Sequence, residues 1–333
     1  MAACVSSSKI FLTLRGSLFA SHRKTLLPAA SLVQTWSPAD SRRNASTHAS
    51  NTESKNNETY CIDLVRTRDY EGFLCSLLLP AEARGSSFAL RAFNVELAQI
   101  KDSVSQKTIG LMRMQFWKKT LEDIYNDDPP PQPVAIELWK AVNKHKLTKR
   151  WFSRIIEERE KDLNDRAYQN IQELESYAEN VQSSLVYLML EALGIKDVHA
   201  DHAASHIGKA QGIVTCLRAT PYNSSRRKVY LPMDICMLHS VSQEDFMRGS
   251  RETNVRNVIF DIASQAHVHL QHARSFNKSV PPKAAPAFML TVGLEDYLDK
   301  VRKLDFDVFH PSLQKRNPLL PINLYIRSWK NTY

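Results

Sequence analysis

Two groups of closely spaced histidines are the first candidates for chemistry in this sequence of 333 residues. They are His199, His202 and His206 and, further along the chain, His267, His269 and His272. Residues three or four positions apart share a helix face, so each group has imidazole nitrogens that could converge on a metal ion. A structural zinc site needs four ligands, and neither group has a clear fourth. A polar, solvated helix surface is therefore the simpler interpretation of both groups.

A short basic cluster, Arg226-Arg227-Lys228, is the next candidate. It could contact an anionic headgroup or a diphosphate, with each charge contributing roughly 1 kcal/mol near an anionic membrane. A solvated loop is the alternative.

The five cysteines offer less, because their number is odd and no two form a C-x-x-C pair. They are expected to be reduced and mostly buried.

The sequence predicts that the elements carrying these residues are helices almost throughout. Glycine is scarce, with nine in the chain, and apolar residues recur with a helical period. Helices are expected over residues 60–79, 81–104, 109–125, 134–142, 147–163, 170–193, 200–218, 255–276, 284–304 and 322–329. A loop through Pro221 to Pro232 is expected after residue 218, because proline interrupts helices. No repeat or alternating strand pattern is present, so residues 60–333 are predicted to form a single all-α domain.

The N-terminal 43 residues resemble a mitochondrial transit peptide in composition. Residues 1–50 contain six Lys or Arg and one acid, Asp40, a balance of 6 − 1 = +5, and they are rich in Ser, Ala and Leu. Arg15 interrupts the apolar run that a secretory signal would need. Residues 44–59 are polar and are expected to be a disordered linker.

The remaining chain is only mildly basic and has no predicted membrane span. Residues 51–333 carry 38 basic and 34 acidic side chains, a balance of +4, which gives no reason to expect nucleic acid binding. No run of about 18 apolar residues is present, so any membrane attachment should be peripheral. The apolar C-terminal stretch 319–329 is expected to pack on the core, with interfacial membrane contact as the alternative.

Three stretches together resemble the squalene/phytoene synthase family over roughly residues 60–330. They are 88–93 (FALRAF), 177–181 (YAENV), and the segment from Gly208 through Arg218 to Tyr230-Leu231-Pro232. The resemblance implies an isoprenoid-synthase-like helical bundle. It also implies a pocket in which two aspartate-rich helices hold Mg²⁺ against a prenyl diphosphate.

The sequence departs from the family at those aspartate positions. The first motif reads Ala98 and Gln99 before Asp102, and the second reads Ala219 and Asn223. Mg²⁺ is held by carboxylate oxygens together with substrate phosphates, so these replacements leave too few ligands for a metal cluster. No catalytic residue, metal site or cofactor is therefore predicted, and the chain is interpreted as a pseudoenzyme.

Three positions of the family pocket keep a polar side chain: Tyr177, Arg218 and Asp102. They could line a retained pocket or be polar residues that face the core. The family's glycines after the tyrosine are replaced by Gln182, Ser183 and Val186. Glycine at such positions lets a substrate approach the helix closely.

Residues 89–102 and 110–117 most closely resemble a subgroup of the family, the mitochondrial assembly factors of respiratory complex I, the NADH:ubiquinone oxidoreductase. This resemblance implies a protein on the matrix face of the inner membrane that acts early and supports biogenesis of a core membrane subunit. Its partners would be complex I assembly intermediates and membrane subunits, and an isoprenoid-like lipid could occupy the pocket. The alternative is an enzyme that acts on a prenyl-type lipid or prenyl diphosphate.

Overall fold

The computed structural model describes residues 45–333, with side chains described from Lys55 onward. All regular secondary structure in this range is helical, which confirms the predicted all-α class. The elements are α1 (Ala45–Arg68), α2 (Tyr70–Leu77), α3 (Ala81–Ser103), α4 (Lys107–Tyr125), α5 (Pro133–His145), α6 (Lys149–Asp162), α7 (Ile171–Ala178), the π-helix η2 (Glu179–Ser183), α8 (Ser184–Ala192), α9 (Val198–Ser225), α10 (Met233–Leu238), α11 (Gln243–Met247), α12 (Thr253–Ser275), the 3₁₀-helix η3 (Pro282–Phe288), α13 (Leu290–Lys303), the 3₁₀-helix η4 (Pro311–Gln314) and α14 (Leu320–Trp329). The predicted transit peptide, residues 1–43, lies outside the described residues.

The first helix is longer than the sequence suggests. The chain is already helical from Ala45, where a disordered linker is expected over residues 44–59. Cys61 and Val65, one turn apart, are buried in the core and anchor this helix. Extending an existing helix costs far less than nucleating one, and residues 45–59 contain no proline or glycine to stop it. The expectation of a disordered linker is therefore not met over residues 45–59.

The predicted helix over residues 60–79 is divided in two at Asp69. This residue leaves the helical conformation, with φ −132° and ψ 66°, and its carboxylate accepts a hydrogen bond from the Gly72 amide at 3.0 Å. Asp69 thereby caps the start of α2. The same carboxylate accepts a hydrogen bond from Arg91 Nη1 on α3 at 2.9 Å. The break redirects the chain so that the first residues of α2 face the middle of the molecule.

Helix α9 continues through Pro221, so the prediction of a loop immediately after residue 218 is wrong for residues 219–225. Proline removes one amide donor, yet the helix persists because the last turns are embedded in the core. Ala219, Asn223 and Ser224 are all buried. Tertiary packing of these residues outweighs the local preference of one proline.

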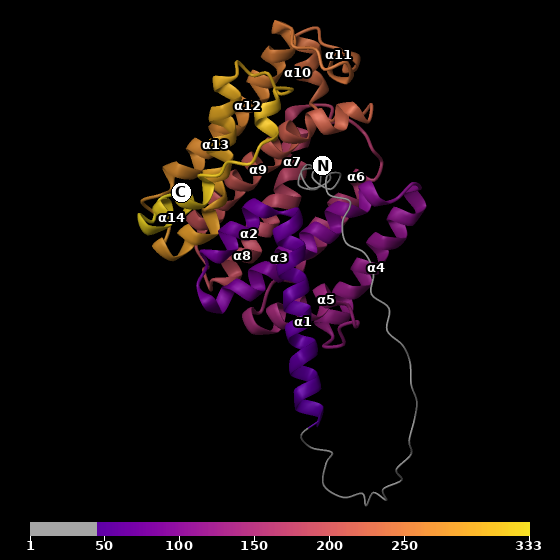
Figure 1. Ribbon diagram of the computed structural model, residues 1–333, viewed down its shortest axis with the longest axis vertical. Helices are drawn as coiled ribbons and strands as arrows, with labels where there is room; N and C mark the ends of the chain where they lie inside the picture. Colours follow the sequence, from indigo (N-terminus) through magenta and orange to yellow (C-terminus); the bar gives the residue numbers. More distant parts are fainter. Residues whose placement is uncertain (1–44) are drawn as a thin grey trace, which may run out of the picture.

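Helix α9 is the central element of the fold. It packs against α12 and α13 on one side and against α7, η2 and α8 on the other (Figure 1). Most buried apolar side chains of the described chain belong to a single hydrophobic core around it. One core of this kind agrees with the predicted single domain.

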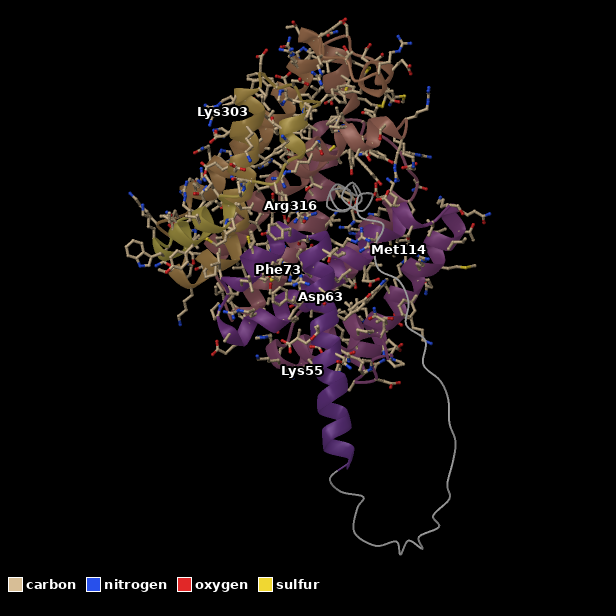
Figure 2. All side chains as sticks on the ribbon, in the orientation of Figure 1. Lys55, Asp63, Phe73, Met114, Lys303 and Arg316 are labelled. Carbon is tan, nitrogen blue, oxygen red and sulfur yellow. The ribbon has the colours of Figure 1, made fainter. Side chains whose placement is uncertain are left out.

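The chain end returns to the N-terminal half of the domain. Helix α14 packs on α13 and α2 through Leu320 and Leu324, both buried. Just before it lies Arg316, which Figure 2 labels. Its guanidinium is 4.5 Å from the centre of the Tyr70 ring at the start of α2. The C-terminal segment therefore closes one side of the space in front of α2.

Two glycines allow α9 to approach the α7–η2–α8 layer closely. A Cβ atom at Gly208 would lie 2.4 Å from the Ser183 amide nitrogen and 2.5 Å from its Cα. A Cβ atom at Gly212 would lie 2.2 Å from the Ala178 Cβ. The Ser183 hydroxyl donates to the Ser205 carbonyl at 3.0 Å, which ties the π-helical turn to α9. Helical residues four positions apart share a face, so the two glycines form one flat strip for this contact.

We expect Gly208→Ala to destabilise the protein by about 1–3 kcal/mol, because the new methyl group overlaps backbone atoms that cannot move independently. Gly85→Ala, in the interior of α3, is the matched control. A Cβ atom added at Gly85 would lie 3.9 Å from its nearest neighbouring atom. That change should stabilise by about 0.5–1 kcal/mol through helix propensity. Chemical denaturation measures both. Equal effects of the two substitutions would contradict the close contact.

Candidate functional site

A cavity of about 210 Å³ lies between α2, α3, α8, α9, α13 and the segment before α14. Its wall is rich in charge. The basic residues are Arg68, Arg91, Arg159, Arg218, Lys300, Lys315 and Arg316, and the acidic residues are Asp69, Glu71 and Asp296. Seven bases against three acids leave a formal balance of 7 − 3 = +4. Apolar side chains from α3 and α8 complete the wall, so the cavity has both cationic and apolar parts.

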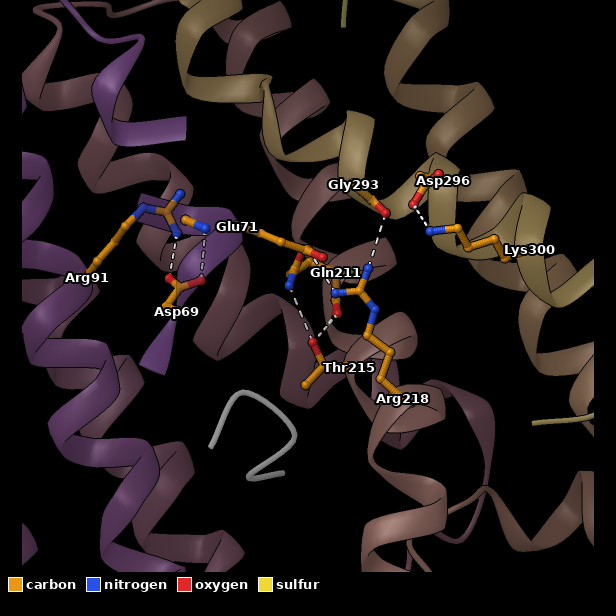
Figure 3. Close-up of polar contacts among 10 residues, drawn as sticks. Asp69, Glu71, Arg91, Gln211, Thr215, Arg218, Gly293, Asp296 and Lys300 are labelled. Carbon is orange, nitrogen blue, oxygen red and sulfur yellow. Dashed lines mark hydrogen bonds and ion pairs between the residues drawn. The ribbon is translucent and has the colours of Figure 1, made fainter. Parts of the chain in front are cut away.

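Each of the three acids has a basic partner in the cavity. Asp69 bonds to Arg91 as described above, and Glu71 Oε2 accepts from Arg218 Nη1 at 2.8 Å. Asp296 Oδ2 accepts from Lys300 Nζ at 2.7 Å (Figure 3). These pairs are partly exposed, so each contributes modestly to stability. They orient the side chains of α2, α3, α9 and α13 toward one another across the cavity.

Arg218 is the best-anchored cation of the site. Its Nη2 also donates to the Gly293 carbonyl at 3.2 Å, and its guanidinium lies 4.7 Å from the centre of the Tyr297 ring. Contacts to α2 and α13 therefore hold this α9 side chain in one orientation. Arg218 lines the cavity, in agreement with the first of the two alternatives drawn from the sequence.

The two other family-pocket positions lie elsewhere. Asp102 lines a small hollow next to the cavity, and its carboxylate is 3.8 Å from Arg226. Tyr177 is buried in the core and does not line the cavity, and burial raises the pKa of its hydroxyl. The structure thus separates Arg218, Asp102 and Tyr177 instead of gathering them in one pocket.

The residues at the aspartate-motif positions do not fit a Mg²⁺ cluster. Ala98 presents only a methyl group to both the cavity and the hollow. Ala219 and Asn223 are buried in α9 and do not line the cavity. Within the described part of the chain, no three His, Cys, Asp or Glu side chains lie close enough together to hold a metal ion. A hard cation needs carboxylates that face each other from two helices, and the residues at these positions do not provide them.

Side chains occupy the positions where the family has glycine after the tyrosine. Gln182 and Val186 both line the cavity, whereas Ser183 packs against Gly208 of α9. The α8 side of the cavity is therefore covered by side chains.

The histidines of the two groups meet between α9 and α12. His206 Nδ1 lies 2.9 Å from His269 Nδ1, so one ring donates a hydrogen bond to the other. His269 Nε2 lies 3.1 Å from Glu175 Oε1 on α7, and the His202 ring stacks on Phe276. His269 is 6% exposed, so solvated surface is the wrong interpretation of this residue. The histidines act as a polar, aromatic contact between two packed helices.

The basic cluster after α9 is neutralised by nearby acids. Lys228 Nζ lies 2.6 Å from Asp165, Arg226 lies 3.8 Å from Asp102, and Arg227 lies 3.8 Å from Glu244. These contacts favour a surface loop held by ion pairs over a free anion site.

Arg159 is one of several charged cavity residues that were not predicted from the sequence. It sits on α6 in a stripe of buried apolar residues formed by Phe152, Ile155 and Ile156, and it is itself 7% exposed. A charged residue on the apolar face of a helix is the signal that could have identified it. Its hydrogen bond to Asn94 on α3 could not have been anticipated, because it depends on the tertiary fold.

The comparisons with known proteins agree with this fold. A sequence profile of the squalene/phytoene synthase family matches residues 65–321. A human protein named NADH dehydrogenase (ubiquinone) complex I, assembly factor 6, is 75% identical over 274 residues, which are 82% of each chain. The homologue of that factor in Drosophila melanogaster is 40% identical over 82% of this chain and 84% of its own.

Solved synthases share the architecture at low identity. A dehydrosqualene synthase in complex with a ligand superposes with a TM-score of 0.74 and 16% identity, covering 84% of this chain and 97% of its own. A squalene synthase from Alicyclobacillus acidocaldarius gives 0.68 and 17%, covering 77% and 96%. These likenesses show the helical isoprenoid-synthase fold.

The histidine contact predicts a loss of stability in acid. Burial and the neighbouring His269 and His272 lower the pKa of His206 from 6.5 to about 4. Between pH 6.5 and about 4 the unfolded chain therefore binds a proton that the folded chain does not, so stability falls as the pH falls through this window. His206→Gln, which cannot titrate, should show a weaker fall in denaturation midpoint between pH 7 and 5.

The exposed His267→Gln is the matched control and should retain the slope of the unchanged protein. If His206→Gln and the unchanged protein lose the same stability over this pH range, His206 is not the group responsible.

Proposed function

Because the chain belongs to the squalene/phytoene synthase family, we propose that it uses this scaffold as a non-catalytic assembly factor of respiratory complex I. The observation that carries the proposal is the 75% identity to the human complex I assembly factor 6 over 82% of each chain. Fold alone cannot decide function, and identity to synthases is far lower, at 20% for a phytoene synthase from Arthrospira platensis.

The geometry of the cavity supports a role without prenyl transfer. Ionisation of a diphosphate requires charge neutralisation, which the family obtains from Mg²⁺ held by aspartates. Ala98 offers no ligand, and Asp102 lies near Arg226. Gln182 and Val186 occupy one wall. The residues at the family positions thus favour a binding scaffold over a synthase.

The proposed location is the matrix face of the mitochondrial inner membrane, with peripheral attachment. No helix in residues 45–333 is long and apolar enough to cross a bilayer. Helix α14 instead exposes Ile322, Tyr325, Ile326 and Trp329, next to Lys330. Aromatic and aliphatic side chains beside basic residues suit the interface of an anionic membrane. From this position the protein would act early, on assembly intermediates and a core membrane subunit.

An enzyme acting on a prenyl-type lipid or prenyl diphosphate is the second candidate. The cationic and apolar cavity is the specific observation that favours it. The two functions differ in their need for carboxylates and for metal. Turnover of farnesyl or geranylgeranyl diphosphate by the purified protein with Mg²⁺ would establish the enzyme and overturn the assembly proposal.

A rescue experiment distinguishes a scaffold role from a carboxylate-dependent reaction. In cells that lack the protein, we expect Asp102→Asn to restore assembled complex I to the level of the unchanged chain, as measured by native gel and NADH oxidation. The substitution removes only a partly exposed contact at 3.8 Å, whose effect on stability should be at most about 1 kcal/mol. Leu217→Pro, at a fully buried site in α9, should fail because it breaks the central helix.

Immunoblots of the variants are the control for protein abundance. Loss of rescue by Asp102→Asn at normal abundance would point to a carboxylate-dependent activity. Full complex I in cells without the protein would refute the assembly role itself.

Membrane attachment is tested on α14. The protein should pellet with mitochondrial membranes and be released by alkaline carbonate, because only one helix face enters the interface. Replacing Ile322, Tyr325 and Trp329 by serine should weaken binding to cardiolipin-containing vesicles at least about tenfold, since each buried apolar side chain contributes on the order of 1.5–3 kcal/mol. Met112→Ser, at an exposed apolar residue of α4, is the control and should bind normally. Carbonate-resistant membrane retention would contradict peripheral attachment.

A further inference from the structure

The side chain of Arg159 is a buried cation that forms no ion pair with any carboxylate of the described residues. Its Nη2 donates to Asn94 Oδ1 at 2.7 Å, but its Nε has no hydrogen-bond partner within the described chain. No carboxylate of the described residues lies within the 4.0 Å of an ion pair with it. Asp162, one turn further along α6, pairs with Lys101 at 3.1 Å instead. A buried guanidinium in this condition is unfavourable unless an anion is supplied.

The position of Arg159 allows an external anion to reach it. Its side chain lines both the main cavity and the adjoining hollow, and Ala98 is the small residue that faces both spaces beside it. The main cavity is partly open to solvent. An anion could therefore approach Arg159 without unfolding any helix.

The acids of the cavity cannot serve as partners, because Arg91, Arg218 and Lys300 already pair with them. Arg91 has a second feature in common with Arg159: its buried Nε also has no hydrogen-bond partner among the described residues. Arg91 and Asn94 lie one turn apart on the same face of α3. Both arginines thus line the cavity, and each has one buried nitrogen donor without a hydrogen-bond partner among the described residues.

We propose that this cavity binds the phosphate monoester group of a single-chain lipid, without a divalent metal, through Arg159 and Arg91. A phosphate monoester carries up to two negative charges and three terminal oxygens, and guanidinium forks match this geometry. The hydrocarbon chain lies against Val95, Leu185, Val186 and Met189 on the cavity wall. Metal is not needed because the arginines supply the charge that metal ions would otherwise supply.

The test is binding of decyl phosphate to the purified full chain in the presence of EDTA, measured by calorimetry and by thermal shift. Decyl phosphate should bind and raise the melting temperature. Inorganic phosphate should bind at least about tenfold more weakly, and decanol should not bind. Equal affinity for inorganic and decyl phosphate would overturn the lipid assignment, and binding that appears only with Mg²⁺ would overturn the metal-free site.

Arg159→Met removes the charge but keeps an unbranched side chain. It should weaken decyl phosphate binding at least about tenfold, the usual effect of losing a charge-assisted hydrogen bond. The same substitution should leave the melting temperature of the ligand-free protein unchanged or raise it, because an unpaired buried charge is removed. Arg150→Met, at an exposed position on the same helix, is the control and should bind as the unchanged protein does.

A second variant tests the site by a route that does not remove Arg159. Ala98→Asp places a carboxylate on the shared wall beside the guanidinium, where it should compete with the ligand and abolish binding while the protein stays folded. Normal decyl phosphate affinity in both Arg159→Met and Ala98→Asp would overturn the proposal. Because binding is measured on purified protein, this outcome is independent of the complex I rescue experiment.

Discussion

The close contact between α9 and the α7–η2–α8 layer is the constraint on which the site depends. Gly208 and Gly212 allow the backbones to approach, and the Ser183 hydroxyl fixes the π-helical turn to α9. The turn adds a residue to one helical repeat and so changes the faces presented before and after it. Gln182 in the turn and Val186 just after it line the cavity together with Arg218. A wider helix separation would move this wall away from the arginines.

Ion pairs between distant segments set the shape of the cavity within that frame. Glu71 and Arg218 are 147 positions apart, yet their contact connects α2 to α9, and Arg218 continues the connection to α13 through Gly293. The position of Glu71 depends in turn on Asp69, which ends α1 and caps α2. A single break in the first helix therefore determines how a central arginine is held. The site is thus held by a series of individually weak contacts, each of which depends on the one before it.

The helices were largely predictable because their signal is local. The patterns over residues 109–125 and 255–276 correspond closely to α4 and α12, since apolar periodicity reports a buried face directly. The break at Asp69 and the helix through Pro221 were missed because capping and core packing outweigh propensity there. Among site residues, Arg218 was found through a motif. Arg159 has a local signal, its place on the apolar face of α6, but the pairing of each cavity acid requires the tertiary fold and has no local signature.

The net positive charge of the cavity bears on which chemistry the family scaffold can support in this protein. A site that binds Mg²⁺ places acids where the metal will neutralise them, and without metal those acids repel an anionic ligand. Here alanine replaces one of these acids at residue 98, and an arginine lines the same wall. An arginine remains charged at any physiological pH and cannot leave, so anion recognition at the proposed site would not depend on the supply of a metal ion. Under the proposed function, the same exchange would remove the Lewis acid that activates a leaving group and so would separate binding from bond cleavage on one fold.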